Sequence, residues 1–291
     1  MPKSTLSELG IVELEADIRT LSRAELAPHF ASRRSGRIVL TRLLRSVVWQ
    51  ARERIASGIE PPVRGNLRTF WYRFVKPVLA HIPDDDQARK DPYDVMLRVF
   101  AELVLDAHLV SYRDFDFTDE NWENRRIGKD LPDTILFAEK TGWVRWLREA
   151  HERFSVTTLA LGGAPSALTS EYTLWALREQ ADLDPERHSL RLIGLVDYDP
   201  SGWIIAHSFQ NQLAKLGWPD STLETLIDPA DYSAEELEMF VFELPKKQQT
   251  KTAKWLEKTG GIGGKPLGLE AESQPYDRLL ERVEVRLAPR P

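Results

Sequence analysis

The sequence predicts a mixed α/β protein, in which a helical N-terminal part is followed by a Rossmann-like parallel sheet. From Pro132 onward, short apolar runs alternate with stretches of helical periodicity, which is typical of parallel strands joined by helices. Before that point, three helical patterns follow one another with no strand pattern between them. With 291 residues, of which 42% are hydrophobic, the chain is long enough for two domains with separate cores.

The N-terminal part divides into a helical extension, residues 1–36, and a domain over residues 37–130. Apolar periodicity in this domain predicts helices over residues 37–55, 67–82 and 91–109. Pro77 must kink the second helix or mark its start, and a polar loop is expected over residues 84–90. Alternating aromatic and acidic residues over 110–127 favour a short hairpin. Three helices followed by a hairpin outline a winged helix, a fold that binds DNA in many proteins and protein in many others.

The C-terminal part, residues 131–291, is expected to begin near Asp130 and to form the parallel sheet. Short apolar runs predict strands over residues 134–138, 157–161 and 190–196. Helical patterns follow each strand, over residues 143–154, 167–180 and 203–216. Further helices are expected over residues 233–239 and 269–287, with a glycine-rich loop over 258–268.

The charge is unevenly distributed along the chain. Eleven basic residues and only two acidic ones lie between Ala31 and Lys76, whereas the whole chain has a formal net charge of −6. One interpretation is a polyanionic partner for the N-terminal part. The other is a solvated helix face whose arginines pair with acidic residues elsewhere, and the sequence leaves both open.

Composition excludes several classes of protein. The chain has no cysteine, which excludes disulfides and thiolate metal sites. No apolar run is long enough to span a membrane, and the N-terminus lacks the apolar segment of a signal peptide. We therefore expect a cytoplasmic, nucleoid-associated protein with no membrane partner.

Acidic residues follow two of the predicted strands. Asp197 and Asp199 close the strand that ends at Val196, and residues two apart on a strand point the same way. Glu139 closes the first strand, and the carboxyl ends of parallel strands meet at one edge of a sheet. An all-oxygen site of this kind suits Mg²⁺ and phosphate chemistry. The alternatives are that Asp199 only caps the following helix and that Glu139 is an acid favoured near a helix N-terminus.

The segment after the second strand, Gly162-Gly163-Ala-Pro-Ser166, is a candidate phosphate-binding loop. Two glycines allow the backbone to approach a phosphate closely. A plain strand-to-helix turn explains the same residues equally well.

Five segments together resemble a known family. LFAEKTG with Glu139, GGAPS, and VDYDPSG with Asp197 and Asp199 resemble the three signatures of a Toprim domain. The form DYDPSGWII is most similar to the A subunit of topoisomerase VI and to the related transesterase that makes meiotic double-strand breaks. LRTFWYRF resembles the segment that carries the nucleophilic tyrosine in that family, and GLEAESQPYDRLL, around Glu270, resembles its closing segment. The resemblance covers most of residues 37–290, although GGAPS lacks the basic residue usual in the family's loop.

The resemblance implies DNA cleavage by transesterification. Tyr72 would attack a DNA phosphodiester and leave a 5′-phosphotyrosyl end, and Arg68, one helical turn earlier, would lie near the same phosphate. Glu139 would have a catalytic role and, with Asp197 and Asp199, would hold Mg²⁺. The residues expected to contact DNA are Arg64, Arg73, Lys76, Gly162 and Gly163.

The resemblance also implies partners. The family acts on double-stranded DNA as a homodimer, in which the tyrosine of one subunit works with the Toprim domain of the other. Its topoisomerases also need a GHKL-type ATPase B subunit. This chain has no ATP-binding motif of its own, because Gly260–Pro266 does not fit the P-loop pattern.

Two other functions remain open from the sequence. The first is a hydrolytic Toprim endonuclease, of the kind found in plasmid or phage defence, in which Tyr72 is a structural core aromatic. The second is a DNA-binding subunit of a larger complex that keeps the fold without catalysis.

Overall fold

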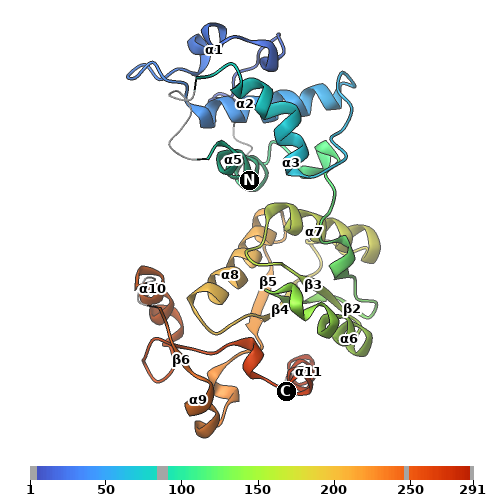
Figure 1. The fold of residues 1–291 in the computed structure, drawn as a ribbon. Coiled ribbons are helices and arrows are strands. Elements are labelled where there is room, and N and C mark those ends of the chain that lie inside the picture. Colours follow the sequence, from blue (N-terminus) through green and yellow to red (C-terminus); the bar gives the residue numbers. More distant parts are fainter. Residues whose placement is uncertain (1–4, 84–90, 246–248, 289–291) are drawn as a thin grey trace. The chain divides into compact units, whose positions relative to one another are not determined.

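The computed structural model describes residues 5–83, 91–245 and 249–288, so the loop expected over 84–90 lies outside the described residues. The chain forms two compact units, Met1–Glu120 and Asn121–Pro291 (Figure 1). The boundary therefore lies between Glu120 and Asn121 and not near Asp130. The reason is that Arg125–Arg126 (β1) already pairs with a strand of the second unit. Within the described ranges, no helix is long and apolar enough to cross a membrane.

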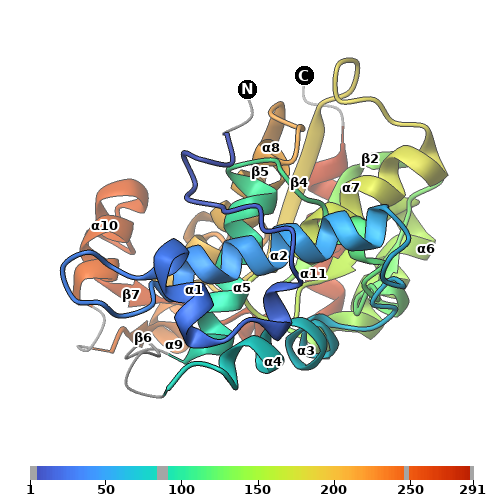
Figure 2. The ribbon, with the colours of Figure 1, turned by 90° about the horizontal axis from the view of Figure 1, so that it is seen from above.

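The first unit is built from helices around an aromatic core. Its longer helices are α1 (Arg23–Phe30), α2 (Leu40–Ala56) and α5 (Pro92–Leu105), and α2 packs against α5 (Figure 2). The rings of Phe70 and Phe100 lie 4.8 Å apart and edge to face, and Phe115 contacts both. All three are fully buried. The three expected helices of this domain are thus present.

The second expected helix is divided into three consecutive pieces. They are α3 (Leu67–Phe70), the π-helical turn η2 (Trp71–Val75) and α4 (Lys76–Leu79). Pro77 has no N–H and cannot continue the regular ladder of hydrogen bonds. The backbone N–H of Lys76 bonds to the carbonyl of Trp71, five residues earlier. Pro77 lies in the first turn of α4, directly after the widened turn η2, which agrees with the expectation that it kinks the helix or marks a start.

The prediction of a hairpin over residues 110–127 is wrong. The segment contains the 3₁₀ turns η3 (Tyr112–Phe115) and η4 (Trp122–Asn124), followed by β1. Its backbone bonds to the loop before α3, because the N–H of Val63 donates to Phe115 and that of Thr118 donates to Gly65. Burial of its aromatic side chains in the core replaces strand pairing, so this segment provides no wing.

The second unit contains a five-stranded, mostly parallel sheet in the order β1-β3-β2-β4-β5. The parallel strands are β2 (Leu131–Ala138), β3 (Val156–Ala160), β4 (Leu190–Leu195) and β5 (Ser221–Thr225), whereas β1 is antiparallel to β3. The three predicted strands are confirmed. The strand β5 was not predicted.

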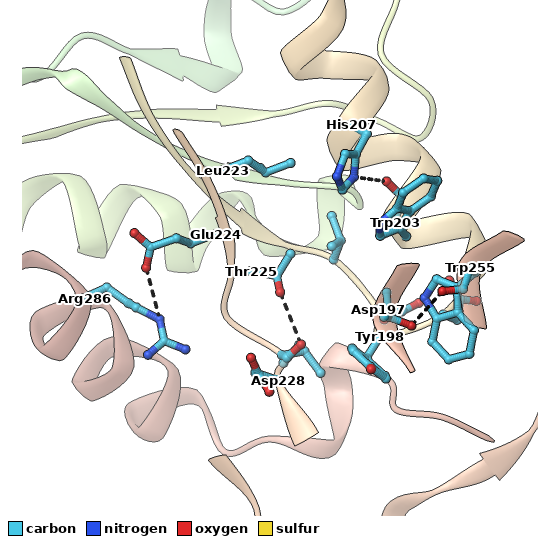
Figure 3. Close-up of a pocket in the computed structure, with 14 residues that line it drawn as sticks. Asp197, Tyr198, Trp203, His207, Leu223, Glu224, Thr225, Asp228, Trp255 and Arg286 are labelled. Carbon is cyan, nitrogen blue, oxygen red and sulfur yellow. Dashed lines mark hydrogen bonds and ion pairs between the residues drawn. The ribbon is translucent and has the colours of Figure 1, made fainter. Parts of the chain in front are cut away.

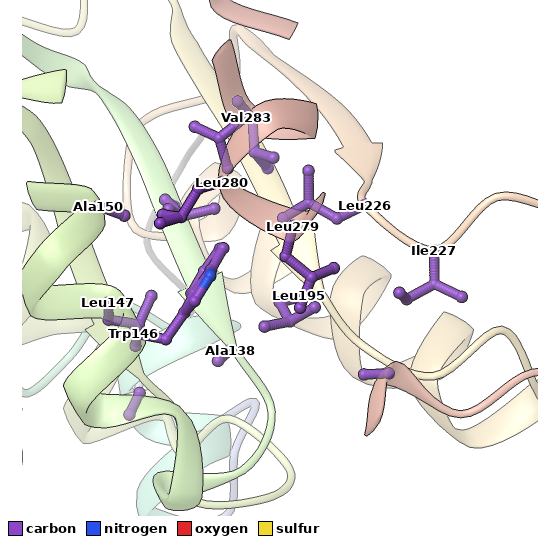
Figure 4. Packing of buried hydrophobic residues seen from close by; sticks show 14 of the residues in the cluster. Ala138, Trp146, Leu147, Ala150, Leu195, Leu226, Ile227, Leu279, Leu280 and Val283 are labelled. Atoms are coloured by element: carbon purple, nitrogen blue, oxygen red, sulfur yellow. The ribbon is translucent and has the colours of Figure 1, made fainter. Parts of the chain in front are cut away.

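Helices cover both faces of this sheet. Alternate residues of β2 enter two separate cores. Leu136 and Ala138 belong to the core with α6 (Val144–Phe154) and α11 (Tyr276–Leu287), in which Figure 4 labels Ala138. Ile135 and Phe137 face the opposite core, with α7 (Ala167–Ala181) and α8 (Pro200–Lys215). Burial on both faces explains why the strands read as continuous apolar runs. The remaining elements are α9 (Ala234–Phe240), α10 (Gln249–Thr259), and the small pair β6 (Phe242–Glu243) and β7 (Leu267–Gly268).

The strand order creates a topological switch point between β2 and β4. The chain passes from β2 to β3 on one side, then returns to place β4 on the other side of β2. In open α/β sheets, ligands bind at the carboxyl ends of the strands at such a point. Ala138 and Leu195, the last residues of β2 and β4, are paired in register.

Candidate functional site

The structure brings the three predicted acidic residues to this switch point. Glu139 follows β2, and its N–H donates to the carbonyl of Leu195 at 3.2 Å. Asp197 and Asp199 follow β4. Burial raises the pKa of Glu139, and the charges of Asp197 and Asp199 raise it further. Each carboxylate is therefore close enough to sense the charge of the others.

Asp199 has a structural role as well. Its Oδ1 accepts a 2.7 Å hydrogen bond from the N–H of Gly202 and caps α8. A side chain at Gly202 would place a Cβ 2.1 Å from the carbonyl oxygen of Asp197, so the turn requires glycine there. Burial raises the pKa of Asp199, the capping bond opposes this, and Asp197 adds repulsion. The capping interpretation is confirmed, because Asp199 accepts backbone hydrogen bonds from Gly202 and Ser201 at the start of α8.

The C-terminal segment supplies two more acids. The backbones of Tyr198 and Leu269 exchange hydrogen bonds as an isolated antiparallel bridge. Beside this bridge, the N–H of Ala271 donates to Oδ1 of Asp197 at 2.8 Å. This contact joins residues 74 apart in sequence. It places Glu270 and Glu272 next to the segment that follows β4.

Lys140 supplies a cation inside this acidic group. Its Nζ lies 3.2 Å from Oδ2 of Asp197 and 2.9 and 3.0 Å from the two carboxylate oxygens of Glu272. Burial opposes the charge of Lys140, but the hydrogen bond to Glu272 and the charge of Asp197 outweigh it, and the pKa of Lys140 is raised. Sequence reasoning missed Lys140 and Glu272, although Lys140 directly follows a strand-end acid.

The carboxylates at this point are suitable ligands for a hard divalent cation, but they do not form a complete coordination site. All the donors are carboxylate oxygens, which Mg²⁺ prefers. The side chain of Glu139 has no hydrogen-bond partner among the described residues, so its oxygens are open to a ligand. However, no three acids or histidines of the described ranges are placed to hold a metal ion together. Lys140 takes the position between Asp197 and Glu272 that a second cation would need.

A cavity of about 460 Å³ lies directly beside these acids (Figure 3). Asp197 and Asp199 form part of its wall. On α8, the rings of Trp203 and His207 lie 4.3 Å apart and line another part. Trp255 of α10 contributes a further aromatic side chain. The acids thus border an open space large enough for a ligand and not a packed core.

The glycine loop after β3 uses one of its amides within the fold. Gly162 and Gly163 have φ values of 72° and 111°, which explains the two glycines by backbone conformation. The N–H of Gly163 donates to the carbonyl of Glu139 at 2.8 Å and is therefore already satisfied. Ser166 caps α7 through the N–H of Thr169. The strand-to-helix turn explains these contacts, and the approach of a phosphate to Gly162 and Gly163 stays a prediction.

In the first unit, Tyr72 lies on the surface. It is 55% exposed, whereas Phe70 and Phe74 on either side are buried. The interpretation of Tyr72 as a core aromatic is therefore wrong. It belongs to the π-helical turn, a conformation found frequently at functional sites. The Nζ of Lys76 lies 5.1 Å from the centre of its ring.

The predicted DNA-contacting arginines differ in their availability. Arg68 is exposed, with its guanidinium 5.5 Å from the ring of Tyr93. Arg64 is 77% exposed and lies 3.6 Å from Asp116. Arg73, by contrast, donates to the carboxylate of Glu60 at 2.7 Å and to the backbone carbonyls of Pro61 and Pro62. The guanidinium of Arg73 therefore holds the loop before α3, and its contact with DNA stays a prediction.

Comparisons with known proteins give no family for this chain. No model of a protein family matches it, and a search of curated proteins finds no match. The resemblance described above thus rests on the five sequence segments, and the function is inferred from the residues.

Proposed function

We propose that the protein cleaves double-stranded DNA by transesterification, with Tyr72 as the nucleophile. One observation carries the proposal: the exposed Tyr72 lies between Arg68, four residues before it, and Lys76, four residues after it. In the described part of the chain neither cation has an acidic partner. An exposed phenol between two unpaired cations is a suitable position for a phosphodiester.

The reaction exchanges one phosphodiester for another. The Oη of Tyr72 forms a bond to phosphorus and gives its proton to solvent. The bond from phosphorus to the 3′-oxygen breaks, and that oxygen leaves and takes up a proton. Arg68 and Lys76 stabilise the charge on the non-bridging oxygens. The 5′-phosphotyrosyl bond conserves the energy of the original bond, so the reverse reaction reseals the strand.

The acids of the second unit provide the other half of the chemistry. Glu139, Asp197 and Asp199 are the residues that would hold Mg²⁺, which stabilises charge on a leaving oxygen when bound. Lys140 holds Asp197 and Glu272 in place through its ion pairs. The resemblance supports a homodimer in which Tyr72 of one subunit acts with these acids of the other. Two strand breaks need two nucleophiles, which a twofold dimer provides.

The proposal includes the fold family and an accessory partner. The first unit is proposed as a reduced winged-helix domain and the second as a Toprim domain. The resemblance also suggests a separate GHKL-type ATPase subunit as an accessory partner.

A hydrolytic Mg²⁺ nuclease is the second candidate. One observation favours it: the carboxylates, Lys140 and the adjoining cavity are all contained in the second unit. A water molecule would then replace the tyrosine as the nucleophile. The breaks would end in free phosphates, and Tyr72 would be dispensable.

Plasmid cleavage followed by denaturation tests the proposal. Supercoiled plasmid and Mg²⁺ are incubated with the wild type, Tyr72→Phe or Asp197→Ala, and DNA covalently bound to protein is measured. Tyr93→Phe removes a phenol hydroxyl in the same unit, and Asp220→Ala removes an exposed acid just before β5, at the opposite edge of the sheet. Adducts that disappear in both test variants and persist in both controls support the proposal. Cleavage without adducts, unaffected by Tyr72→Phe, supports the nuclease, and DNA binding without cleavage supports a non-catalytic subunit.

A further inference from the structure

The loop between α1 and α2 carries three arginines without acidic partners. Arg33, Arg34 and Arg37 are exposed, and none of them forms an ion pair within the described ranges. They belong to the basic stretch of Ala31 to Lys76 that the sequence identified. The structure gives the basic residues of that stretch different roles.

Some of these basic residues are neutralised inside the unit. Arg45 pairs with Glu102 on α5, and Arg54 lies 3.4 Å from Asp17. Arg73 pairs with Glu60, as described above. These arginines hold the helices and loops of the first unit together. The loop after α1 differs from them, because three positive charges without acidic partners lie there within five residues.

The backbone of this loop is fixed by hydrogen bonds. Ala31 and Ile38 form an antiparallel bridge, which closes the loop at its base. Above the bridge, the N–H of Ser32 donates to the carbonyl of Arg37, and the N–H of Gly36 donates to that of Ser32, both at 2.8 Å. Gly36 has a φ of 68° and allows the tight turn. The buried side chains of Phe30 and Ile38 anchor the two ends.

We propose that this loop is a second DNA-binding site. It binds the phosphate backbone of the duplex at a point separate from the cleavage residues. The inference rests on the proposed function in that its ligand is DNA. A guanidinium forms paired hydrogen bonds to phosphate oxygens, and a fixed loop loses little backbone entropy on binding. The loop residues between the arginines are serine and glycine. A loop that inserts into a membrane surface carries apolar or aromatic side chains, which are missing here.

This site binds without reading sequence. Three arginines on a short loop reach neighbouring phosphates, and phosphate contacts carry no sequence information. Each phosphate contact releases counterions and contributes roughly 0.9 to the slope of log K against log salt concentration. Replacing all three arginines therefore lowers that slope by about 2 to 3.

Fluorescence anisotropy with a labelled duplex tests this inference. All proteins carry Tyr72→Phe and all samples lack Mg²⁺, so binding is measured without cleavage. The test variant is Arg33→Ala/Arg34→Ala/Arg37→Ala. The control, Arg187→Ala/Lys258→Ala/Lys265→Ala, removes the same charge from exposed positions of the second unit. A third variant replaces the three loop arginines with lysine, and thermal unfolding verifies that every variant is folded.

A lower salt slope in the loop variant alone, with the slope largely restored by lysine, is the expected result. An equal loss in both alanine variants would reduce the effect to net charge and overturn the site. An unchanged slope, or no binding by the parent protein, would also overturn it. The plasmid experiment gives a separate answer. Adducts with an unchanged slope reject only the loop, whereas a changed slope without adducts rejects only the transesterase.

Discussion

The ammonium group of Lys140 lies 3.2 Å from Oδ2 of Asp197, so the chain places its own cation beside the central carboxylate of the switch point. Glu272, from the C-terminal segment, holds the same ammonium at 2.9 Å. The acids between β2 and β4 are thus partly neutralised without a metal. A divalent cation at this point would find the carboxylate of Glu139, which has no hydrogen-bond partner among the described residues, but it would meet repulsion from Lys140.

Lys140→Met is predicted to tighten divalent-cation binding. Removing a unit charge about 4 Å from a doubly charged ion relieves roughly 2 kcal/mol even at the dielectric constant of water, and we expect about tenfold tighter binding after relaxation. Titration calorimetry with Mg²⁺ or Mn²⁺ measures this directly. Lys265→Met, at an exposed position of the same unit, is the matched control. Weaker binding in Lys140→Met would show that the lysine is needed to position Asp197 and Glu272.

Glu139→Gln is predicted to stabilise the metal-free protein at neutral pH. Because burial and the charge of Asp197 raise the pKa of Glu139 in the folded state, its ionised form opposes folding above that pKa. The destabilisation is absent below the pKa of the unfolded chain, so the benefit of the substitution disappears as pH falls. Calorimetric unfolding in a chelator, over a range of pH, measures the difference in Tm.

The control for that experiment is Glu152→Gln, on the exposed surface of α6. It should leave the pH dependence of Tm unchanged. Added Mg²⁺ should raise the Tm of the wild type more than that of Glu139→Gln. A uniform loss of stability at every pH would contradict the account of Glu139.

Arg68→Ala and Arg73→Ala are predicted to separate activity from stability. Arg68 is exposed and unpaired in the described structure, so its loss should lower adduct formation by roughly 100-fold and leave Tm unchanged. Arg73 holds Glu60 and the carbonyls of Pro61 and Pro62, so its loss should cost about 1 to 3 kcal/mol of stability. Chemical denaturation and adduct yield are measured on both variants. A loss of stability in Arg68→Ala, with a loss of adducts at unchanged stability in Arg73→Ala, would contradict this account.

Gly202→Ala is predicted to damage the start of α8. The new Cβ would lie 2.1 Å from the carbonyl oxygen of Asp197, and overpacking of this kind costs about 1 to 3 kcal/mol. Gly142→Ala is the control, because no atom lies within 4 Å of its Cβ position. Urea unfolding should show a lower midpoint for Gly202→Ala alone. Equal midpoints would mean that the turn after Asp197 adjusts without cost.

The sequence predicted the parts of the fold that depend on local pattern. Strands β2, β3 and β4 are buried on both faces, so each is a short apolar run bounded by turn residues. The edge strand β5 has one aliphatic residue, Leu223, in its five residues, and its pairing with β4 leaves no apolar signal. The prediction of a hairpin failed because the alternation of Phe115 and Phe117 with acidic residues places these two rings in the aromatic core and does not reflect strand pairing.

The site was predictable to the extent that it follows from strand ends. Glu139 and Asp197 meet because β2 and β4 are neighbours, which a parallel sheet makes probable from sequence alone. The contact between Lys140 and Glu272 joins residues 132 apart and depends on the path of the C-terminal segment. The partners of Arg73 depend in the same way on tertiary structure, so an unpaired arginine and a paired one look identical in sequence.

Mass spectrometry of the covalent product tests the central claim most directly. Cleaved plasmid is denatured, digested with nuclease and trypsin, and searched for a peptide that carries a nucleotide. Cleavage after Arg68 and Arg73 gives the peptide Thr-Phe-Trp-Tyr-Arg, whose tyrosine is Tyr72. The account predicts a nucleotide joined through its 5′-phosphate to this tyrosine. Broken plasmid with free 5′-phosphates and only unmodified peptide would contradict it.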